Sequence, residues 1–132
     1  MDEPIASVMR TPARCIGMDA TLPDVQREFA EHRLSWAPVV DGDGTVRGVI
    51  ADADLQHWRG RDFQAARAWQ ACRWQPICVS PLDGVCDVAQ RMLDRHVHHV
   101  VVMDGTAIVG VISSLDFVRC FVQQARARLL GT

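Results

Sequence analysis

The chain of 132 residues repeats itself once, and this internal repeat constrains the fold more than any single motif does. Residues 5–58 align with residues 69–121, and matching features recur 62 to 64 residues apart. The changes in spacing fall in loops, where insertions are tolerated. We therefore expect a first repeat over residues 5–58, a connecting segment over 59–68 and a second repeat over 69–126. The matched features are Pro12 with Pro76, Asp24-Val25 with Asp87-Val88, Val39-x-Asp41-Gly42 with Val102-x-Asp104-Gly105, and Gly48-Val49-Ile50-x-x-x-Asp54 with Gly110-Val111-Ile112-x-x-x-Asp116.

Each repeat predicts the element order β-α-β-β-α. Apolar residues after each proline indicate a short strand, and the two later strands of each repeat are joined by Gly-containing turns typical of hairpins. The first helix begins at Thr21 and Asp24, which have the spacing of a capping box. The expected strands cover residues 13–16, 37–41 and 46–50 in the first repeat, and 77–80, 100–104 and 107–112 in the second.

Apolar periodicity indicates which helix faces are buried. The first helix of each repeat is expected to bury Val25, Phe29 and Ala30, or Val88, Met92 and Leu93. The second helices begin near Asp52 and Ser114. A helix over 61–70, among Trp58, Trp69 and Trp74, is expected to pack on the core, with a dimer or partner surface as the alternative. The last helix carries an amphipathic stripe over Leu115, Val118, Phe121, Val122, Ala125 and Leu129.

These elements predict an α/β (α+β) fold made of two tandem copies. One copy alone has little core, so we expect the two copies to pack about a pseudo-twofold axis. Such packing leaves a cleft between like units, and clefts of this kind tend to bind ligands.

Composition excludes several classes of function. The net charge is −2 and all 14 basic residues are arginine, so no positive excess favours nucleic acid. No apolar run is long enough for a membrane span and no signal peptide is present, so a cytoplasmic protein is expected. The five cysteines are odd in number and form no C-x-x-C, which argues against a disulfide framework. No G-x-S-x-G, H-E-x-x-H or Gly-rich phosphate loop is present, so we expect no enzyme activity and no catalytic residue.

The repeat resembles the cystathionine-β-synthase-type (CBS) domain, present as a stand-alone tandem pair. The resemblance covers residues 5–126 and implies a regulatory module that senses energy state by binding AMP, ADP, ATP or S-adenosylmethionine between the repeats. It also implies that pairs of repeats form homodimers. It is carried by Val8-Met9-Arg10-Thr11-Pro12, Ala37-Pro38-Val39-Val40-Asp41, Gly48-Val49-Ile50-Ala51-Asp52-Ala53-Asp54, Val100-Val101-Val102-Met103-Asp104 and Gly110-Val111-Ile112-Ser113-Ser114-Leu115-Asp116.

In this family the motif G-x-x-[ST]-x-x-D places a hydroxyl and a carboxylate against a nucleotide. The second repeat matches at Ser113 and Asp116, although the same spacing is also a capping box that would stabilise the helix without a ligand. The first repeat keeps Asp54 but has Ala51 in place of the hydroxyl residue. One good site and one degraded or empty site are therefore expected.

The resemblance also implies further contacts in the second repeat. His98 and His99 stand where some members contact phosphate, with a pair of ordinary imidazoles at a strand start as the alternative. Ile77 and Cys78 would line the adenine, behind Arg73. Metal binding by His96, His98 and His99 is not expected, because no second cluster of ligands accompanies them.

Two functions follow from these observations. The first is a non-enzymatic sensor that binds an adenosyl ligand without any further cofactor and acts on an unidentified partner protein. The second is a ligand-free structural dimerisation module. An enzyme fragment is a third and weaker alternative, because the two repeats occupy nearly the whole chain.

Overall fold

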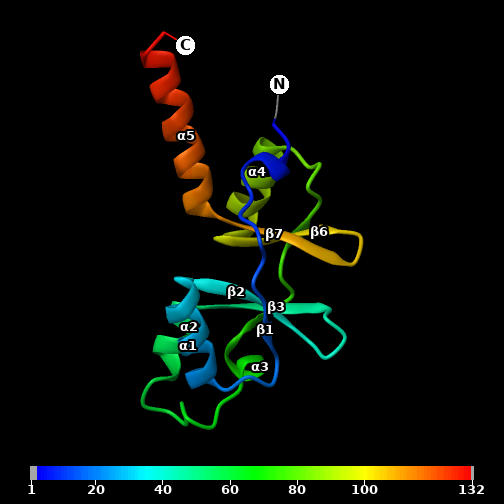
Figure 1. Ribbon diagram of the computed structural model, residues 1–132, viewed down its shortest axis with the longest axis vertical. Coiled ribbons are helices and arrows are strands. Elements are labelled where there is room, and N and C mark those ends of the chain that lie inside the picture. Colours follow the sequence, from blue (N-terminus) through cyan, green and yellow to red (C-terminus); the bar gives the residue numbers. More distant parts are fainter. Residues whose placement is uncertain (1–2, 132) are drawn as a thin grey trace. The chain divides into compact units, whose positions relative to one another are not determined.

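The computed structural model describes residues 3–131, which divide into two compact units (Figure 1). We call residues 13–76 the continuous unit. Residues 3–12 and 77–131 form the other one, which we call the split unit because it is built from both ends of the chain.

The continuous unit holds a four-stranded sheet of order β1-β2-β3-β4, in which β1 and β2 are parallel and the other pairs are antiparallel. Helices α1 and α2 supply much of its core: Val25, Phe29 and Leu55 pack with Val39 and Ile50 of the strands. The elements are β1 (Ile16–Gly17), α1 (Leu22–His32), β2 (Trp36–Val40), β3 (Val46–Ala51), α2 (Asp52–Trp58), α3 (Ala68–Ala71) and β4 (Arg73–Trp74).

The split unit holds a three-stranded sheet of order β5-β6-β7, with β5 and β6 parallel and β6 and β7 antiparallel. Val88 and Met92 of α4 pack on Val100, Val102 and Ile112 of this sheet. The elements are a 3-10 helix η1 (Ile5–Ser7), β5 (Cys78–Val79), α4 (Val85–Arg95), β6 (His99–Asp104), β7 (Ala107–Ser113) and α5 (Ser114–Leu129).

The predicted β-α-β-β-α order is confirmed in both repeats, since local signals dictate it. The Thr21 hydroxyl accepts a hydrogen bond from the Asp24 amide at 3.2 Å, and the Asp24 carboxylate accepts one from the Thr21 amide at 3.3 Å. This capping box starts α1 at the expected place. The hairpins turn at Gly44 and Gly105, whose positive φ angles of 81° and 63° suit glycine.

Residues 3–12 belong to the split unit, although residues 5–12 begin the first repeat. Ile5 is fully buried in the split unit's core, and its amide donates to the Asp83 carbonyl at 2.8 Å. In the same way the segment after α2 stays in the continuous unit, where β4 pairs with β3. The equivalent prolines Pro12 and Pro76 are the last residues before the chain passes from one unit to the other.

The buried faces of three helices are narrower than the periodicity predicts. Ala30 and Leu93, at equivalent positions of α1 and α4, are both exposed. In α5 the expected stripe is also exposed: Phe121 is 70% exposed, and Asp116 is the helix's one buried residue among those described. The reason is that α5 projects from the sheet after its first turns instead of lying across it (Figure 1). Periodicity thus marked an apolar face correctly but did not indicate what covers it.

The expected helix over residues 61–70 is wrong. Within that range only the first three residues of α3 are helical, because the backbone of this segment bonds to residues before α1 and at its start instead. The Ala68 amide donates to the Ala20 carbonyl at 2.8 Å, and the Leu22 amide donates to the Ala66 carbonyl at 3.1 Å. Trp69 and Trp74 remain largely exposed, at 42% and 51%.

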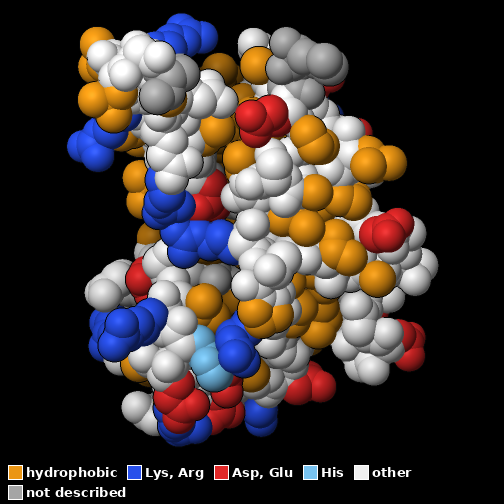
Figure 2. Space-filling model, turned by 45° about the horizontal axis from the view of Figure 1, so that its top comes forward, with side chains coloured by type: hydrophobic (Ala, Val, Ile, Leu, Met, Phe, Trp, Pro, Cys, Tyr) orange, Lys and Arg blue, Asp and Glu red, His pale blue; other side chains and the backbone are white. Residues whose placement is uncertain are grey.

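The surface mixes charges of both signs with exposed apolar side chains (Figure 2). Within residues 3–131, no helix is both long enough and apolar enough to cross a bilayer.

Candidate functional site

Sheet register places several predicted binding residues on one face of the split unit's sheet. Directly paired residues of neighbouring strands carry their side chains on the same face, and successive residues of a strand alternate between faces. The face in question is therefore opposite to the one on which Val100 and Val102 meet α4. On this face Cys78 pairs with Val101, Val101 with Val111 and Val111 with Arg10, and His99 pairs with Ser113.

Asp116 is the best-connected polar side chain of this region. It stands in the first turn of α5, and its side chain is only 2% exposed. Its Oδ2 accepts hydrogen bonds from the Ser113 amide at 2.8 Å and the Ser113 hydroxyl at 3.3 Å. The predicted pair Ser113 and Asp116 is therefore in direct contact, in the manner of a helix cap.

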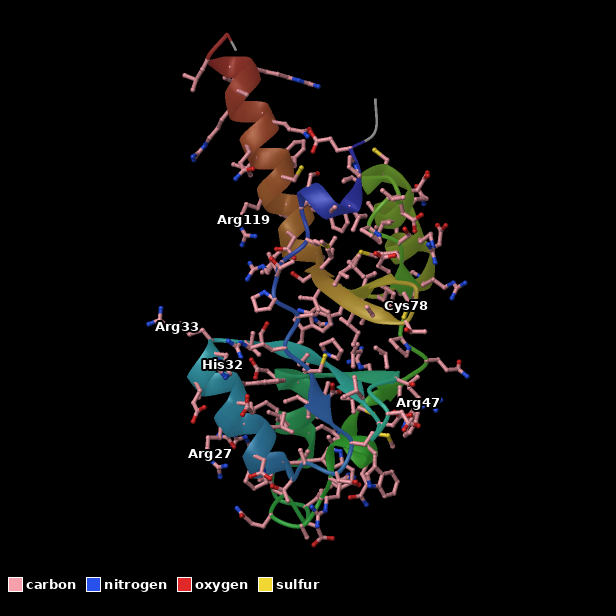
Figure 3. All side chains as sticks on the ribbon, turned by 45° about the vertical axis from the view of Figure 1, so that its right-hand side comes forward. Arg27, His32, Arg33, Arg47, Cys78 and Arg119 are labelled. Carbon is pink, nitrogen blue, oxygen red and sulfur yellow. The ribbon has the colours of Figure 1, made fainter. Side chains whose placement is uncertain are left out.

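The other carboxylate oxygen of Asp116 receives two arginines. Arg10 Nε and Arg119 NH1 each donate to Oδ1 at 2.8 Å. Arg10 comes from the N-terminal segment, which pairs with Val111 through two backbone hydrogen bonds of 2.9 and 3.1 Å. Arg119 comes from the same helix as Asp116, three residues further along (Figure 3).

These contacts decide the ionisation of Asp116. Burial by itself would raise the pKa of the Asp116 carboxyl. The Ser113 amide, Arg10 and Arg119 outweigh burial and lower that pKa below its ordinary value. The group is therefore a carboxylate at neutral pH, and it holds two guanidinium ions against one oxygen.

The continuous unit repeats part of this arrangement. Asp54 stands in the first turn of α2, and its Oδ2 accepts a hydrogen bond from the Ala51 amide at 2.9 Å. Arg73 Nε lies 3.6 Å from Asp54 Oδ1, which is a looser ion pair than either one at Asp116. His57 stands where the split unit has Arg119. The first repeat thus keeps the carboxylate and loses both the hydroxyl and the second arginine.

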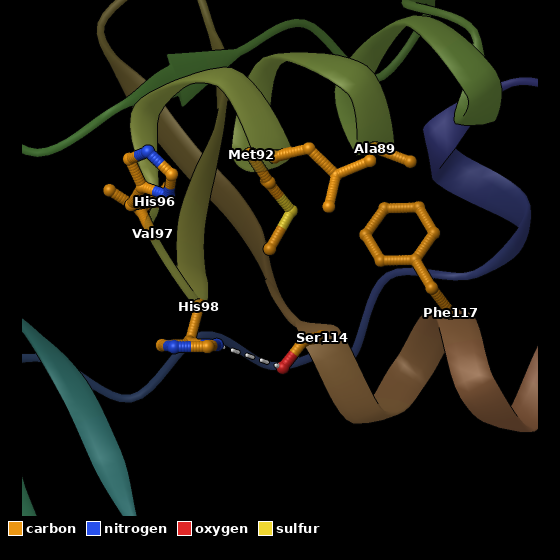
Figure 4. Close-up of a pocket in the computed structure, with 8 residues that line it drawn as sticks. Ala89, Met92, His96, Val97, His98, Ser114 and Phe117 are labelled. Atoms are coloured by element: carbon orange, nitrogen blue, oxygen red, sulfur yellow. Dashed lines mark hydrogen bonds between the residues drawn. The ribbon is translucent and has the colours of Figure 1, made fainter.

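The two predicted ligand-binding histidines, His98 and His99, lie in different surroundings. His99 begins β6, where it pairs with Ser113 and lies on the same face as Cys78. His98 is exposed at the edge of a hollow of about 450 Å³ between α4 and α5, with its Nδ1 3.5 Å from the Ser114 hydroxyl (Figure 4). The hollow is also lined by Ala89, Met92, Leu93, His96, Val97 and Phe117.

Ile77 and Cys78 lie at the start of the split unit's sheet. The Ile77 carbonyl accepts a hydrogen bond from the Val101 amide at 3.0 Å, and the Ile77 side chain packs partly against the core. Desolvation raises the pKa of the Cys78 thiol, which favours its protonated form at neutral pH. Cys78 therefore offers the sheet face a small apolar group.

Arg10 and Arg119 were not among the predicted site residues. Arg119 carries a local signal, because Asp116 and Arg119 have the i,i+3 spacing of neighbours on a helix surface. Arg10 carries none, since it is 106 residues away from Asp116 in the sequence. Only the packing of the N-terminal segment on the second repeat brings these two residues together.

One cluster of potential metal ligands lies elsewhere, on α1. Glu28, Glu31 and His32 offer ligand atoms within 4.8 Å of one another, and His32 Nε2 is 3.4 Å from Glu28 Oε2. The two glutamates are exposed and the spacing is that of ordinary neighbours on one helix face, so we assign no metal site to this cluster.

Known proteins resemble this chain in sequence and in fold. Arabinose 5-phosphate isomerase KdsD of Yersinia pestis is 26% identical over 122 residues, which cover 89% of this chain and 37% of that enzyme. The chain thus spans little more than a third of this relative, and the likeness concerns only that part.

Two solved structures share the fold at low sequence identity. The CBS domain pair of protein MJ0100, in complex with 5′-methylthioadenosine and S-adenosyl-L-methionine, superposes with a TM-score of 0.85 at 18% identity and covers 94% of this chain and 99% of that one. The CBS domain protein PAE2072 from Pyrobaculum aerophilum, complexed with AMP, has a TM-score of 0.78 at 24% identity and covers 86% and 89%. The family model of the CBS domain matches twice, over residues 5–60 and 70–123, and the chain therefore belongs to the CBS domain family.

Proposed function

We propose that the chain is a non-enzymatic regulatory module that binds an adenosyl ligand at Asp116 and Ser113. The observation that carries this proposal is the arrangement at the start of α5, where a nearly buried carboxylate and a hydroxyl belong to one G-x-x-S-x-x-D motif. A carboxylate can accept hydrogen bonds from the hydroxyls of a ribose, and Asp116 Oδ1 would become available to them when Arg10, whose side chain is 58% exposed, moves away. His99 and Cys78, on the same sheet face, would line the rest of the ligand.

The ligands of structural relatives support an adenosyl compound as the ligand. MJ0100 holds 5′-methylthioadenosine and S-adenosyl-L-methionine, and PAE2072 holds AMP. All three molecules share the adenosine part, to which a carboxylate facing a ribose is suited. We extend the candidates to ADP and ATP and place the protein in the cytoplasm, where these nucleotides would report energy state to a partner protein.

Regulation requires that the ligand prefer one conformation of the protein over another. A ligand shifts a conformational equilibrium only by the difference between its affinities for the two states. The Arg10–Asp116 ion pair joins the N-terminal segment to α5, so a ligand that engages Asp116 would change how firmly that segment is held.

Thermal unfolding with and without ligand tests the proposal. A ligand at a hundred times its dissociation constant adds about 2.7 kcal/mol, which raises Tm by several degrees for a chain of this size. We expect such a rise with at least one of AMP, ADP, ATP and S-adenosylmethionine, and we expect Asp116→Asn to abolish most of it. Asparagine is preferable to alanine here, because its side-chain oxygen still accepts the Ser113 amide.

The matched control is Asp24→Asn. Asp24 also caps a helix and also pairs with an arginine three residues later, with Arg27 NH1 3.1 Å from its Oδ1, but it lies outside the site. This control should keep the full thermal shift. A shift that survives in Asp116→Asn would refute the site, and no shift with any of the four ligands would refute the proposed function.

A ligand-free dimerisation module is the second candidate, and the exposed apolar face of α4 and α5 favours it. Leu93 and Phe121 are 69% and 70% exposed, and a second hollow of about 570 Å³ separates the two helices beside Phe121. Exposed apolar groups of this extent commonly mark a protein interface. A homodimer is compatible with both candidates, so the oligomeric state alone does not separate them.

The dimer itself is tested by Phe121→Glu. Phe121 is exposed, so this change should leave the fold of a single chain intact while placing a charge in the interface. Light scattering after size exclusion should report a dimer for the wild type and a monomer for the variant. A variant that remains dimeric would exclude this face as the interface.

A further inference from the structure

The acceptor positions of the Asp116 carboxylate are filled by donors of the protein itself. A carboxylate offers about four lone-pair positions, two on each oxygen. The Ser113 amide and hydroxyl donate to Oδ2 at 2.8 and 3.3 Å, and Arg10 Nε and Arg119 NH1 each donate to Oδ1 at 2.8 Å. A ribose hydroxyl can therefore bind this carboxylate only by displacing one of these four donors.

Arg10 is the donor that can leave with the least change to the fold. The Ser113 amide is part of the cap of α5, and Arg119 lies on the same helix as Asp116, three residues further along. Arg10 instead comes from the N-terminal segment, and its side chain is 58% exposed. Turning this side chain into solvent breaks no backbone hydrogen bond.

The backbone around Arg10 is held in place, so only the side chain needs to move. Two backbone hydrogen bonds of 2.9 and 3.1 Å join Arg10 to Val111, and Ile5 of the same segment is fully buried in the core of the split unit. The guanidinium group is therefore tethered beside Asp116. A tethered group competes with a free ligand at a high effective concentration.

We propose that the Arg10–Asp116 ion pair is an autoinhibitory latch, which occupies the ribose position of Asp116 and lowers the affinity of the split unit for its adenosyl ligand. This inference rests on the proposed function, because it concerns the same carboxylate. Ligand binding must break the latch, and release of the ligand lets the tethered arginine return to Oδ1. Any partner that draws the Arg10 side chain away from Asp116 would raise the affinity for the ligand.

The equivalent carboxylate of the continuous unit is more open. Asp54 Oδ2 accepts the Ala51 amide at 2.9 Å, but Arg73 Nε lies 3.6 Å from Oδ1, which is beyond hydrogen-bond distance. The Asp54 side chain is 14% exposed, against 2% for Asp116. The closed latch therefore belongs to the repeat that keeps the full G-x-x-S-x-x-D motif, where there is a ligand affinity to restrain.

Calorimetric titration of the full chain with adenosine tests the latch. Adenosine has a ribose and no phosphate, so the charge of Arg10 cannot assist its binding. We expect Arg10→Met to bind adenosine about tenfold more tightly than the wild type, because the ligand no longer has to break a charge-assisted hydrogen bond. The gain should disappear when Arg10→Met is combined with Asp116→Asn.

The matched control is Arg27→Met. Arg27 NH1 donates to the capping aspartate Asp24 at 3.1 Å in the same way, but outside the site, so this variant should bind adenosine as the wild type does. Circular dichroism checks that each variant is folded.

A second measurement follows the latch in the wild type. The Nε–H group of Arg10 gives its own signal in ¹⁵N nuclear magnetic resonance, and Arg10→Met identifies that signal by its loss. Saturation with adenosine should shift the signal and accelerate its exchange with water, because the hydrogen bond to Asp116 breaks. An arginine with a purely structural role would keep its signal unchanged.

The outcomes separate the latch from the proposed function. Adenosine binding that is equal or weaker in Arg10→Met would overturn the latch while adenosyl binding stands. An Arg10 signal that does not respond to saturating adenosine would do the same. Folded wild type and folded Arg10→Met that both fail to bind adenosine would refute the latch and the adenosyl function together.

Discussion

The equivalent glycines Gly48 and Gly110 offer a sharp test of the packing, because each lies where a crossing segment meets a strand. At Gly48 an added Cβ would lie 2.5 Å from the backbone oxygen of Arg73, in the partner strand β4. At Gly110 it would lie 2.6 Å from Sδ of Met9 and 3.1 Å from the Arg10 backbone oxygen. The first obstacle is backbone, whereas the nearest atom in the second case belongs to a flexible side chain.

The cost of alanine should therefore differ between the two sites. Cβ atoms essentially never approach a neighbouring atom within 3.0 Å, so Gly48→Ala must displace β4 by about half an ångström or more. Overpacking of this kind costs about 1–3 kcal/mol, and weakening the β3–β4 hydrogen bonds costs about 1 kcal/mol more. Alanine also has less conformational freedom than glycine in the unfolded chain, and this difference stabilises the folded state by about 0.5–1 kcal/mol. We expect a net loss of about 1.5–3 kcal/mol for Gly48→Ala and about 0–1 kcal/mol for Gly110→Ala.

The position of the tryptophans makes the measurement specific. Trp36, Trp58, Trp69 and Trp74 are all four tryptophans of the chain, and all lie in the continuous unit. Urea unfolding followed by fluorescence therefore reports on the unit that contains Gly48, while far-ultraviolet circular dichroism reports on both units. A loss in Gly110→Ala equal to or larger than that in Gly48→Ala would refute the argument that backbone and side-chain obstacles differ.

Two further predictions concern charge and capping. Because the pKa of Asp116 is lowered in the folded protein, its contribution to stability is complete at neutral pH, persists above the ordinary aspartate range and is lost as the pH falls through the lowered value. At pH 7 the free energy of unfolding of Asp116→Asn should be lower than that of the wild type by about 1–3 kcal/mol. As the pH falls from 7 to 2, urea unfolding should show a smaller further loss of stability in this variant than in the wild type. A loss as steep as the wild type's would contradict the assignment. Thr21→Ala removes the hydroxyl that accepts the Asp24 amide and should cost about 1 kcal/mol in fluorescence-detected unfolding, with Thr21→Ser close to wild type. Equal losses of stability in Thr21→Ala and Thr21→Ser would indicate that the threonine methyl group matters and not the helix cap.

Local features of the sequence predicted the elements well. The turns at Gly44 and Gly105 and the capping box of Thr21 are decided within a few residues, so the chain order β-α-β-β-α could be inferred without a structure. The segment 61–70 could not be predicted in this way, because hydrogen bonds to residues 18–22 determine its backbone and those partners are distant in sequence. Tertiary contacts override a weak helical tendency there.

The same difference between local and distant contacts applies to the candidate site. Ser113, Asp116 and Arg119 fall within seven residues, and their spacing on a helix indicates that they meet. Arg10 reaches Asp116 only because Ile5 is buried in the split unit and the bridge to Val111 sets the register of the N-terminal segment. Sequence repeats align Arg10 with the region of Arg73, yet the alignment does not reveal that each arginine faces the aspartate of the other repeat.

The passage of the chain between units at Pro12 and Pro76 also fixes an order of events during synthesis. All of the continuous unit has been made once residue 76 is added, so it can complete its sheet while the ribosome is still adding the rest. The split unit needs Ile5, which is made before the continuous unit, and Ile112 and Asp116, which come more than a hundred residues later. Its opening segment must therefore wait with its apolar side chains unburied. Any shortening of that segment would destabilise residues made more than sixty positions later, because it would remove from the split unit both a piece of the core and one of the two arginines.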